Sequence, residues 1–280
     1  MKKLYKRPLR LAVYGKGGIG KSFVSANLSV LFAKDRRVIH VGCDPKGDST
    51  RNLTAQNPPE PALGKLLDCA APPESVSDLV RQGIRGVDCV EAGGPEPGEG
   101  CGGMGILKLF QFLTRTGFFK ESDYQVQLFD VLGDVVCGGF VAPMRFAAPL
   151  TILVVVSEEV HSLFAANQVA KAVRRYADSG VSLAGLVLNR RDNLARVDHV
   201  GRFAEALGTT VIADLLRTPE VFDADVARKP VVVQEPTGLL AIEFHLLTER
   251  LREFEPEGSG TVTPLDSATF DALMFEAARP

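Results

Sequence analysis

The sequence predicts an α/β fold in which a mostly parallel β-sheet is flanked by helices. Two observations support this prediction. Continuous apolar segments alternate with helical patterns along the chain, which is typical of strands that helices bury on both faces. A glycine-rich segment, GKGGIGKS at residues 15–22, lies between the first apolar segment and the first helical pattern.

The order of the elements follows from the spacing of the apolar residues. Short apolar runs predict strands at residues 9–15, 37–44, 126–131, 151–157, 183–189 and 210–215. Apolar residues at three- and four-residue spacing predict helices at 20–35, 104–116, 158–177, 196–207 and 236–253. Neither a long repeat nor a low-complexity block interrupts this order, so we expect a single domain over residues 1–254.

A Pro/Gly/Ser-rich break at residues 255–264 begins a C-terminal tail, residues 255–280. The tail carries the apolar pattern of a short amphipathic helix: Leu265, Phe270, Leu273, Met274 and Ala277. Two placements are open for this helix, which could dock on its own domain or pack on a partner subunit.

Composition excludes several classes of protein. The net charge of −2, with 24% charged residues, gives no general attraction for nucleic acid. The longest apolar run, LTILVVV at 150–156, is far shorter than the ~20 residues that span a bilayer. The basic N-terminus lacks the apolar core of a signal peptide. We expect a cytoplasmic protein without nucleic-acid or membrane partners.

The segment GKGGIGKS matches the P-loop pattern GxxxxGK[ST] in the required position between a strand and a helix. Its glycines allow backbone N–H groups to face phosphate oxygens, and the following helix adds positive potential. Lys21 would reach the β- and γ-phosphates of ATP, and Ser22 would bind Mg²⁺. The predicted nucleotide contacts are Gly17, Gly18, Ile19, Gly20, Lys21, Ser22 and Phe23.

Lys16 is an additional lysine in this loop, and GKGGxGK is similar to the deviant Walker A class of P-loop. The resemblance implies that Lys16 reaches across a dimer interface to the nucleotide of the partner subunit. It therefore implies a homodimer whose two ATP sites face each other. A solvated surface lysine is the alternative.

Two acidic segments follow later strands, CDPKGDS at 43–49 and DVLGD at 130–134. Ligands of such sheets bind at the carboxyl ends of the strands, so both segments should face the phosphates. Asp130 is the natural Walker B-type carboxylate near Mg²⁺, and Asp44 could orient the attacking water. Lys46 and Asp48 are candidate switch residues. Aspartates that merely form turns are the alternative.

Two of the five cysteines stand beside paired glycines: Cys101 in GGPEPGEGCGGMGI at 93–106 and Cys137 in DVVCGGFVAP. Two thiolates cannot complete the four-cysteine ligation of a [4Fe–4S] cluster, but two chains related by a two-fold axis can. The glycines would permit close approach and free N–H groups for the cluster sulfurs. Cys43 and Cys89 are predicted to be buried structural residues, and Cys69 has no predicted role.

The chain resembles the iron-protein family of nitrogenase and nitrogenase-like reductases over roughly residues 9–275. The matching segments are YGKGGIGKS, VGCDPKGDSTR, CVEAGGPEPGEGCGGMGI, DVLGDVVCGGFVAPMR, AANQVAKAVRRYADSG and GLVLNRRDN. The resemblance implies a [4Fe–4S] cluster, one per homodimer, held by Cys101 and Cys137. It also implies catalytic roles for Lys16, Asp44 and Asp134, nucleotide or switch roles for Lys46, Asp48 and Asp130, and an adenine contact for Asn189.

The same resemblance implies an ATP-hydrolysing electron donor that receives electrons from a ferredoxin or flavodoxin and passes them singly to a catalytic partner. Met104 stands where nitrogenase iron proteins carry arginine, and Phe23 stands where they carry threonine. Residues 215–233 also diverge from the family. We expect the reductase of a methylthio-alkane reductase; a nitrogenase iron protein and a chlorophyllide or other tetrapyrrole reductase are the alternatives.

Two other classes share parts of this pattern. A partitioning-type ATPase would need a basic patch or a basic amphipathic tail, whereas the 255–280 tail is acidic. An iron–sulfur carrier ATPase would need a C-terminal CxxC, and no cysteine follows Cys137. Both remain remote alternatives.

Overall fold

The computed structural model describes residues 8–55, 57–95, 99–133, 138–256 and 262–275. An eight-stranded sheet forms its centre, with the strand order β3-β4-β2-β5-β1-β6-β7-β8. The strands are β1 Leu9–Tyr14, β2 Val38–Cys43, β3 Arg81–Gln82, β4 Asp88–Glu91, β5 Val126–Val131, β6 Leu150–Val156, β7 Val181–Asn189 and β8 Val211–Leu215. Among these strands β3 runs antiparallel to β4, and the other neighbouring pairs are parallel.

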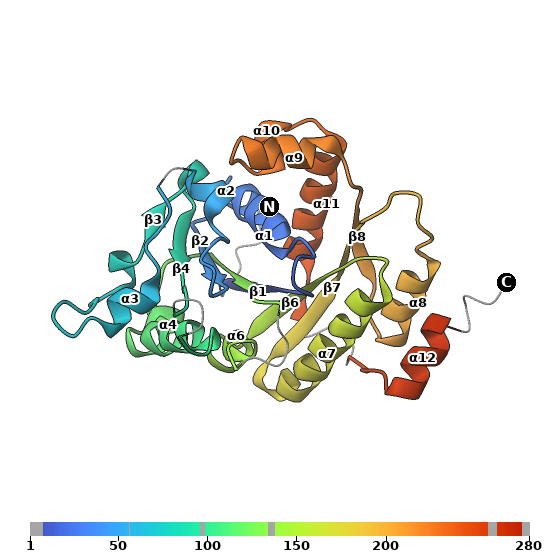
Figure 1. The fold of residues 1–280 in the computed structure, drawn as a ribbon, viewed down its shortest axis with the longest axis horizontal. Helices are drawn as coiled ribbons and strands as arrows, with labels where there is room; N and C mark the ends of the chain where they lie inside the picture. The colour runs from blue at the N-terminus through green and yellow to red at the C-terminus, as the bar shows by residue number, and fades with distance from the viewer. Residues whose placement is uncertain (1–7, 56, 96–98, 134–137, 257–261, 276–280) are drawn as a thin grey trace.

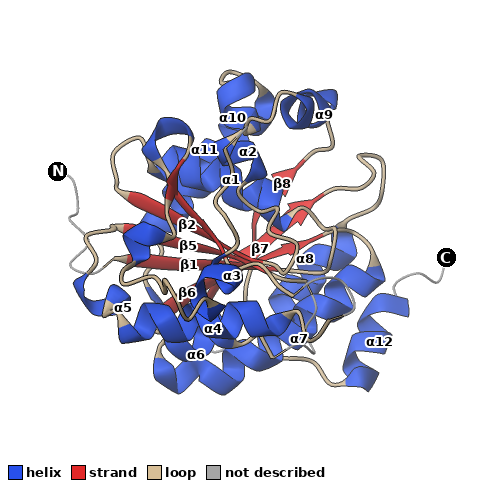
Figure 2. Ribbon diagram, turned by 60° about the vertical axis from the view of Figure 1, so that its left-hand side comes forward, coloured by secondary structure: helices blue, strands red, loops and turns tan. Residues whose placement is uncertain are grey.

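Helices cover both faces of this sheet (Figures 1 and 2). The longer ones are α1 Lys21–Phe32, α4 Gly103–Arg115, α7 Val160–Tyr176, α8 Asp198–Ala206, α9 Pro219–Val226, α11 Leu239–Glu253 and α12 Ser267–Phe275. The shorter ones are α2 Arg51–Thr54, α3 Ala62–Leu67, α5 Phe118–Glu121, α6 Ala142–Phe146 and α10 Val231–Gln234. Single 3₁₀ turns lie at Val76–Asp78, Ile84–Gly86 and Ala177–Ser179.

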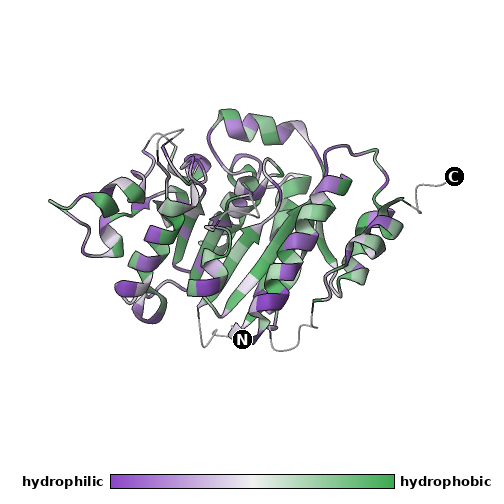
Figure 3. Ribbon diagram, turned by 60° about the horizontal axis from the view of Figure 1, so that its bottom comes forward, coloured by the Kyte–Doolittle hydropathy of each residue, from purple (hydrophilic) through white to green (hydrophobic). Residues whose placement is uncertain are grey.

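The sheet separates two hydrophobic cores. Side chains alternate across a strand, so in β1 Leu11 and Val13 enter one core while Ala12 and Tyr14 enter the other. The first core lies under α1, α10 and α11, and the second lies under α4, α7 and α8. The strands in the middle of the sheet are accordingly mostly apolar (Figure 3), as the sequence predicts for a sheet covered on both faces.

The central position of β1 determines where a ligand can bind. β1 lies between β5 and β6, and Val13 is in register with Asp130 of β5. Loops that leave β1 and its neighbours therefore meet at the carboxyl edge of the sheet, where the strand order reverses. This is the usual place for a ligand in such a fold.

The described part of the C-terminal tail packs on its own chain. The Asn167 side chain of α7 donates to the Leu265 carbonyl oxygen at 2.8 Å and accepts from the Leu265 N–H at 2.9 Å. The ring of Phe270 in α12 meets the rings of Phe164 and Phe203 edge-on, at centroid distances of 5.7 and 6.0 Å. Both contacts hold the tail over α7 and α8.

The predicted fold class is confirmed, and the sequence locates the central strands well. β5 has the predicted bounds, and β1, β2, β6, β7 and β8 differ from theirs by one or two residues. The prediction missed β3, β4, α9 and the short helices. In the described part of the chain, no helix combines the length and apolar character that a bilayer crossing requires.

Candidate functional site

The loop between β1 and α1 forms an open cradle at the carboxyl edge of the sheet. Among the residues that the structure describes, no atom lies within 4 Å of where a Cβ atom would stand on Gly17 or Gly18. Gly18 has a φ angle of +71°, which favours glycine. The backbone of the loop is thus bare on its outer side, which fits a bound phosphate chain.

The Lys21 side chain folds back onto the backbone of this loop. Its side chain is largely buried, and its Nζ donates to the carbonyl oxygen of Lys16 at 3.1 Å. Burial lowers the pKa of Lys21, while the charges of Asp130 and Asp44 raise it. Lys46 and Asp48 lie close enough to act on the same ammonium. The structure therefore brings the P-loop lysine and the charged residues of both acidic segments together.

Asn189, at the end of β7, supports the loop from the side. Its Nδ2 donates to the carbonyl oxygen of Ile19 at 2.8 Å. A Cβ atom on Gly20 would lie only 2.3 Å from that Nδ2, and Gly20 has a φ angle of +101°. Asn189 thus contacts the P-loop backbone, and only glycine fits at position 20.

Asp130 is the centre of a cluster of hydroxyl groups. Its Oδ2 accepts from Ser49 Oγ at 2.5 Å and its Oδ1 accepts from Ser25 Oγ at 3.3 Å. Burial raises the pKa of Asp130, and hydrogen bonds from Ser22 and Ser49 oppose that rise. A carboxylate among hydroxyls is an oxygen-rich donor set of the kind that Mg²⁺ prefers. The residues present therefore fit a nucleotide with its divalent cation.

A cavity of about 410 Å³ opens beside these groups. Asp225 of α9 enters it and accepts a hydrogen bond from Asn52 Nδ2 at 2.7 Å. This contact places the divergent 215–233 segment against α2, which begins two residues after the acidic segment at 43–49. The lining residues are Ser22, Phe23, Asp48, Ser49, Arg51, Asn52, Asp225 and Arg228.

Cys101 lies exposed on a loop that packs against the same acidic segment. A Cβ atom on Gly102 would stand 2.6 Å from Cγ of Pro45, and one on Gly94 would stand 2.6 Å from Cβ of Pro45. Pro45 directly follows Asp44. The thiol-bearing loop and the acidic segment at 43–49 are therefore in van der Waals contact.

Described residues on either side of the 134–137 gap contact the P-loop and the start of α4. A Cβ atom on Gly133 would lie 2.4 Å from the backbone nitrogen of Gly17, so these two segments of the backbone are in contact. A Cβ atom on Gly139 would lie 3.1 Å from Cα of Gly103, two residues after Cys101. The predicted residues Asp134 and Cys137 lie outside the described residues.

Cys43 and Cys89 are buried, as predicted. Burial raises the pKa of both thiols. Cys69 is exposed. Within the described ranges, no group of three or more His, Cys, Asp or Glu side chains could hold a metal ion.

Phe23 and Met104 are the two departures that the sequence singled out. Phe23 lines the cavity of about 410 Å³ and packs edge-on against Phe244 of α11, with ring centroids 5.3 Å apart. Met104, in the first turn of α4, is 38% exposed beside the Cys101 loop. Met104 thus lies on the surface next to the thiol.

Sequence reasoning missed two buried polar groups below the site, His40 and Glu91. Burial raises the pKa of Glu91 to about 8, although hydrogen bonds from Thr50 oppose this rise. The Glu91 Oε1 accepts from the Thr50 backbone N–H at 2.6 Å. Each residue interrupts an apolar run, and that interruption is the signal that could have identified them.

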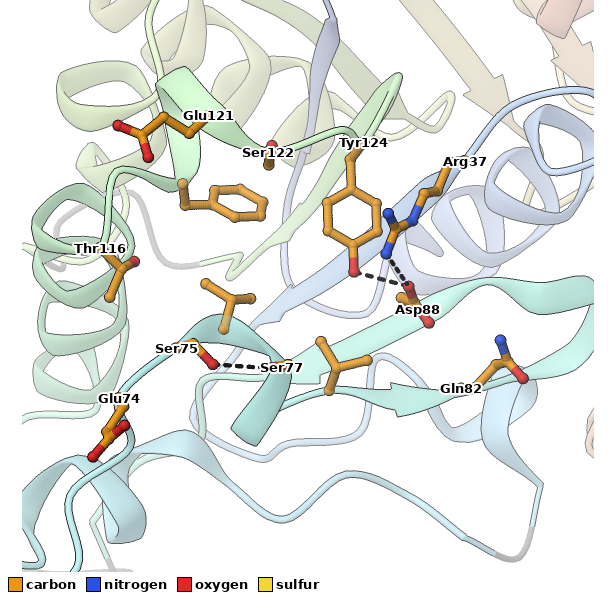
Figure 4. A pocket seen from close by; sticks show the side chains of 13 residues that line it. Arg37, Glu74, Ser75, Ser77, Gln82, Asp88, Thr116, Glu121, Ser122 and Tyr124 are labelled. Carbon is orange, nitrogen blue, oxygen red and sulfur yellow. Dashed lines mark hydrogen bonds and ion pairs between the residues drawn. The ribbon is translucent and has the colours of Figure 1, made fainter.

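A second pocket, of about 620 Å³, lies at the opposite, amino edge of the sheet (Figure 4). Tyr124 donates to Asp88 at 2.8 Å, and the Arg37 guanidinium lies over the Tyr124 ring at 4.7 Å. None of the predicted site residues lines this pocket.

Comparisons with known proteins agree with this geometry. The sequence model of the family described as "4Fe-4S iron sulfur cluster binding proteins, NifH/frxC family" matches residues 9–278. The chain is 38% identical over 269 residues to "Nitrogenase iron protein 2" of Methanothermobacter thermautotrophicus, covering 95% of this chain and 97% of the relative.

Solved structures of lower identity share the fold. The septum site-determining protein MinD of Pyrococcus horikoshii, complexed with Mg-ADP, has a TM-score of 0.67 at 18% identity, over 88% of this chain and 96% of its own. A ParA family ATPase from Chlorobium tepidum has a TM-score of 0.65 at 16% identity, over 86% of this chain and 98% of its own.

Proposed function

The chain belongs to the NifH/frxC family of 4Fe–4S cluster binding proteins, and on that premise we propose that it is the ATP-dependent reductase component of a nitrogenase-like two-component system. The observation that carries the proposal is the contact of Pro45 with Gly94 and Gly102. A segment that faces the phosphates thereby touches the loop that bears Cys101. Such a contact allows a change at the nucleotide to reach the thiol.

At the nucleotide, each described residue has a chemical task that its position supports. The bare backbone of Gly17 and Gly18 and the ammonium of Lys21 would bind the phosphates. Ser22 would bind Mg²⁺, which Asp130 would help to hold in place. Asp44, half-buried beside Lys21, would orient the attacking water.

Further groups of the predicted site lie at or near the surface of the protomer. Lys46 and Asp48 are exposed and Lys16 is half-buried. We assign Lys16 to the nucleotide of a partner subunit and Lys46 and Asp48 to the switch. Asn189 would contact the adenine from its place beside the P-loop. Asp134 keeps its predicted catalytic role.

Cys101 offers an exposed sulfur between glycines, which fits a ligand shared with another subunit. When bound, a [4Fe–4S] cluster supplies one-electron redox chemistry. Cys101 and Cys137 of each of two chains would provide its four sulfurs, giving one cluster per homodimer. The neighbouring glycines leave room for the second chain.

We propose methylthio-alkane reductase as the partner system, in which a ferredoxin or flavodoxin supplies the electrons. Met104 supports this choice, because an exposed methionine replaces the arginine of nitrogenase iron proteins beside the thiol. A nitrogenase iron protein is the second candidate, because the curated relative at 38% identity bears that name. The two candidates differ in the catalytic component that accepts the electrons, so identifying that component distinguishes them.

Anaerobic purification tests the central proposal. The wild type should be a brown dimer with about four irons per two chains, and Cys101→Ala should be colourless. Cys69→Ala is the matched control, since Cys69 is also exposed but has no site role, and it should keep the colour. A colourless wild-type monomer that hydrolyses ATP would refute the proposal.

The partner assignment needs a separate assay. The reduced protein with ATP should support product formation by the catalytic component of a methylthio-alkane reductase, measured as C–S bond cleavage of a small sulfide. Ammonia formation with a nitrogenase catalytic component, without C–S cleavage in the first assay, would establish the second candidate instead.

A further inference from the structure

His40 is a polar residue in the middle of a strand that is buried throughout. All six residues of β2 are buried, and His40 is 0% exposed. A buried imidazole is costly unless both ring nitrogens find hydrogen-bond partners. Here Nδ1 lies 2.8 Å from Ser29 Oγ on α1, and Nε2 lies 2.7 Å from Ser49 Oγ.

The direction of these hydrogen bonds follows from counting protons. The single hydroxyl proton of Ser49 is donated to Asp130 Oδ2, so Ser49 Oγ can only accept from His40. Nε2 therefore carries the ring proton. Burial lowers the pKa of His40 to about 3, so the ring is neutral and Nδ1 accepts from the Ser29 hydroxyl.

The result is a buried series of hydrogen bonds in which every donor points toward the Asp130 carboxylate. Ser29 donates to His40, His40 donates to Ser49, and Ser49 donates to Asp130. Successive hydrogen bonds in a low dielectric polarise one another, and the last of them is assisted by the charge of the carboxylate. Ser29, His40 and Ser49 are each at most 2% exposed, so water does not compete for these groups.

This series of hydrogen bonds also connects three elements of the candidate site. Ser29 belongs to α1, which follows the P-loop, and Asp130 belongs to β5. Ser49 directly follows the exposed switch candidate Asp48. His40 thus fixes both the orientation of the Asp130 carboxylate and the end of the switch segment.

We propose that His40 is a positioning residue of the nucleotide–metal site, acting through Ser49 to hold the Asp130 carboxylate in the orientation that binds the divalent cation. The inference rests on the proposed ATP-dependent function. It adds a residue that contacts neither nucleotide nor metal.

His40→Leu and His40→Gln together test this role. Leucine fills the space without a donor, whereas the glutamine amide can still donate to Ser49. His40→Leu leaves the buried Ser49 Oγ without its donor, and because losing the partner of a buried polar group costs about 1–3 kcal/mol, it should raise the Mg²⁺ concentration for half-maximal ATP hydrolysis by about 10-fold. His40→Gln should stay within about 3-fold of the wild type on the same scale.

Binding measurements separate positioning from a general loss of structure. The affinity for nucleotide without Mg²⁺ should change less than about 2-fold in His40→Leu, while the affinity for Mg-nucleotide falls by about 10-fold. Ile39→Val is the matched control, because Ile39 lies in the same strand but in the opposite core. It should lower thermal stability and leave the Mg²⁺ requirement unchanged.

A second variant covers the case in which His40→Leu does not fold. Ser49→Ala removes the link between His40 and Asp130 and should raise the Mg²⁺ requirement by a similar factor. When Ser49 is already replaced by alanine, adding His40→Gln should not change the Mg²⁺ concentration for half-maximal ATP hydrolysis, because the two positions act as one unit. Unequal requirements in that background would overturn the inference.

A spectroscopic measurement tests the geometry without any activity. The ¹⁵N spectrum of labelled histidine should show His40 with a protonated Nε2 and an unprotonated Nδ1, and Ser49→Ala should shift the Nε2 signal. A proton on Nδ1 would overturn the inference, as would an unchanged Mg²⁺ requirement in His40→Leu. Failure of the wild type to bind nucleotide would instead refute the proposed function, whatever the spectrum shows.

Discussion

Pro45 and Gly102 are packed so closely that a single methyl group does not fit between them: a Cβ atom on Gly102 would lie 2.6 Å from Pro45 Cγ. Pro45 belongs to the acidic segment at 43–49, which is predicted to face the phosphates, and Gly102 follows Cys101. The contact is therefore a steric link between the nucleotide segment and the thiol loop.

Gly102→Ala tests this link. Alanine forces Pro45 and the loop apart, so the acceleration of iron removal by a chelator on addition of Mg-ATP should fall by about 2- to 30-fold, the range for coupling free energies of about 0.5–2 kcal/mol. Gly64→Ala is the control, because in the described structure no atom lies within 4 Å of a Cβ atom there. An unaltered acceleration in Gly102→Ala would exclude the link.

Glu91 should give the protein a stability that depends on pH. Its pKa is about 8 in the folded state against 4.5 as an ordinary glutamate, so between these values the folded state holds a proton that the unfolded state has released. Stability is therefore fully present below pH 4.5 and falls as the pH rises towards 8, by up to about 1.4 kcal/mol per pH unit.

Glu91→Gln keeps the side chain neutral and retains an acceptor for the Thr50 N–H. Denaturant unfolding from pH 5 to pH 8 should show that the advantage of Gln over Glu grows as the pH rises. Glu205→Gln, an exposed change on α8, should show no such trend. A difference between Glu91→Gln and the wild type that is constant with pH would contradict the assignment.

Asn189 should contribute to nucleotide binding by holding the P-loop. Asn189→Leu removes the hydrogen bond to the Ile19 carbonyl, which at about 0.5–1.5 kcal/mol should weaken ATP binding by about 2- to 12-fold. A fluorescent-nucleotide titration measures this change, with the exposed Asn57→Ala as control. Equal affinities for Asn189→Leu and the wild type would show that the loop holds its shape alone.

Gly20→Ala should weaken nucleotide binding more than any substitution of Asn189. Its methyl group would collide with Asn189 Nδ2, and its φ angle of +101° is unfavourable for alanine. Adding Asn189→Gly removes the collision but not the backbone strain, so the double variant should still bind nucleotide poorly. Full recovery of binding would show that the collision alone matters.

Asn167 should hold the C-terminal tail in place. Asn167→Ala removes two buried hydrogen bonds to Leu265 and leaves its backbone groups unpaired, at a cost of about 2–4 kcal/mol. Limited proteolysis should then cut the chain near residues 255–265 faster than in the wild type. The exposed Asn193→Ala serves as control, and equal cleavage rates in both variants would show that the Phe270 contacts suffice.

The sequence predicted the fold where its signals are local and continuous. The apolar run 126–131 gives β5 its bounds because every residue of that strand is buried. β4 was missed because Asp88 and Glu91 occur within its four residues and glycines follow it. α9 was missed because acidic residues interrupt its apolar spacing.

For the candidate site, the sequence predicts the groups but not the contacts between them. The P-loop, Asp44, Asp130 and Cys101 all follow from motifs. The contact of Pro45 with Gly102 joins residues far apart in the chain, and no periodic pattern reports such a contact. The sequence does not single out His40, because neither it nor its partners, Ser29 and Ser49, belong to a motif.

The two cores on either side of the sheet have a consequence for how such a protein can diversify. α1, which follows the P-loop, rests on one core, whereas α4, which follows Cys101, rests on the other. Substitutions in well-separated regions act almost independently. Substitutions on the outer side of α4, away from the contact of Gly102 with Pro45, could therefore change that surface while the P-loop side of the sheet stays intact, and a protein engineer could exchange the surface by the same route.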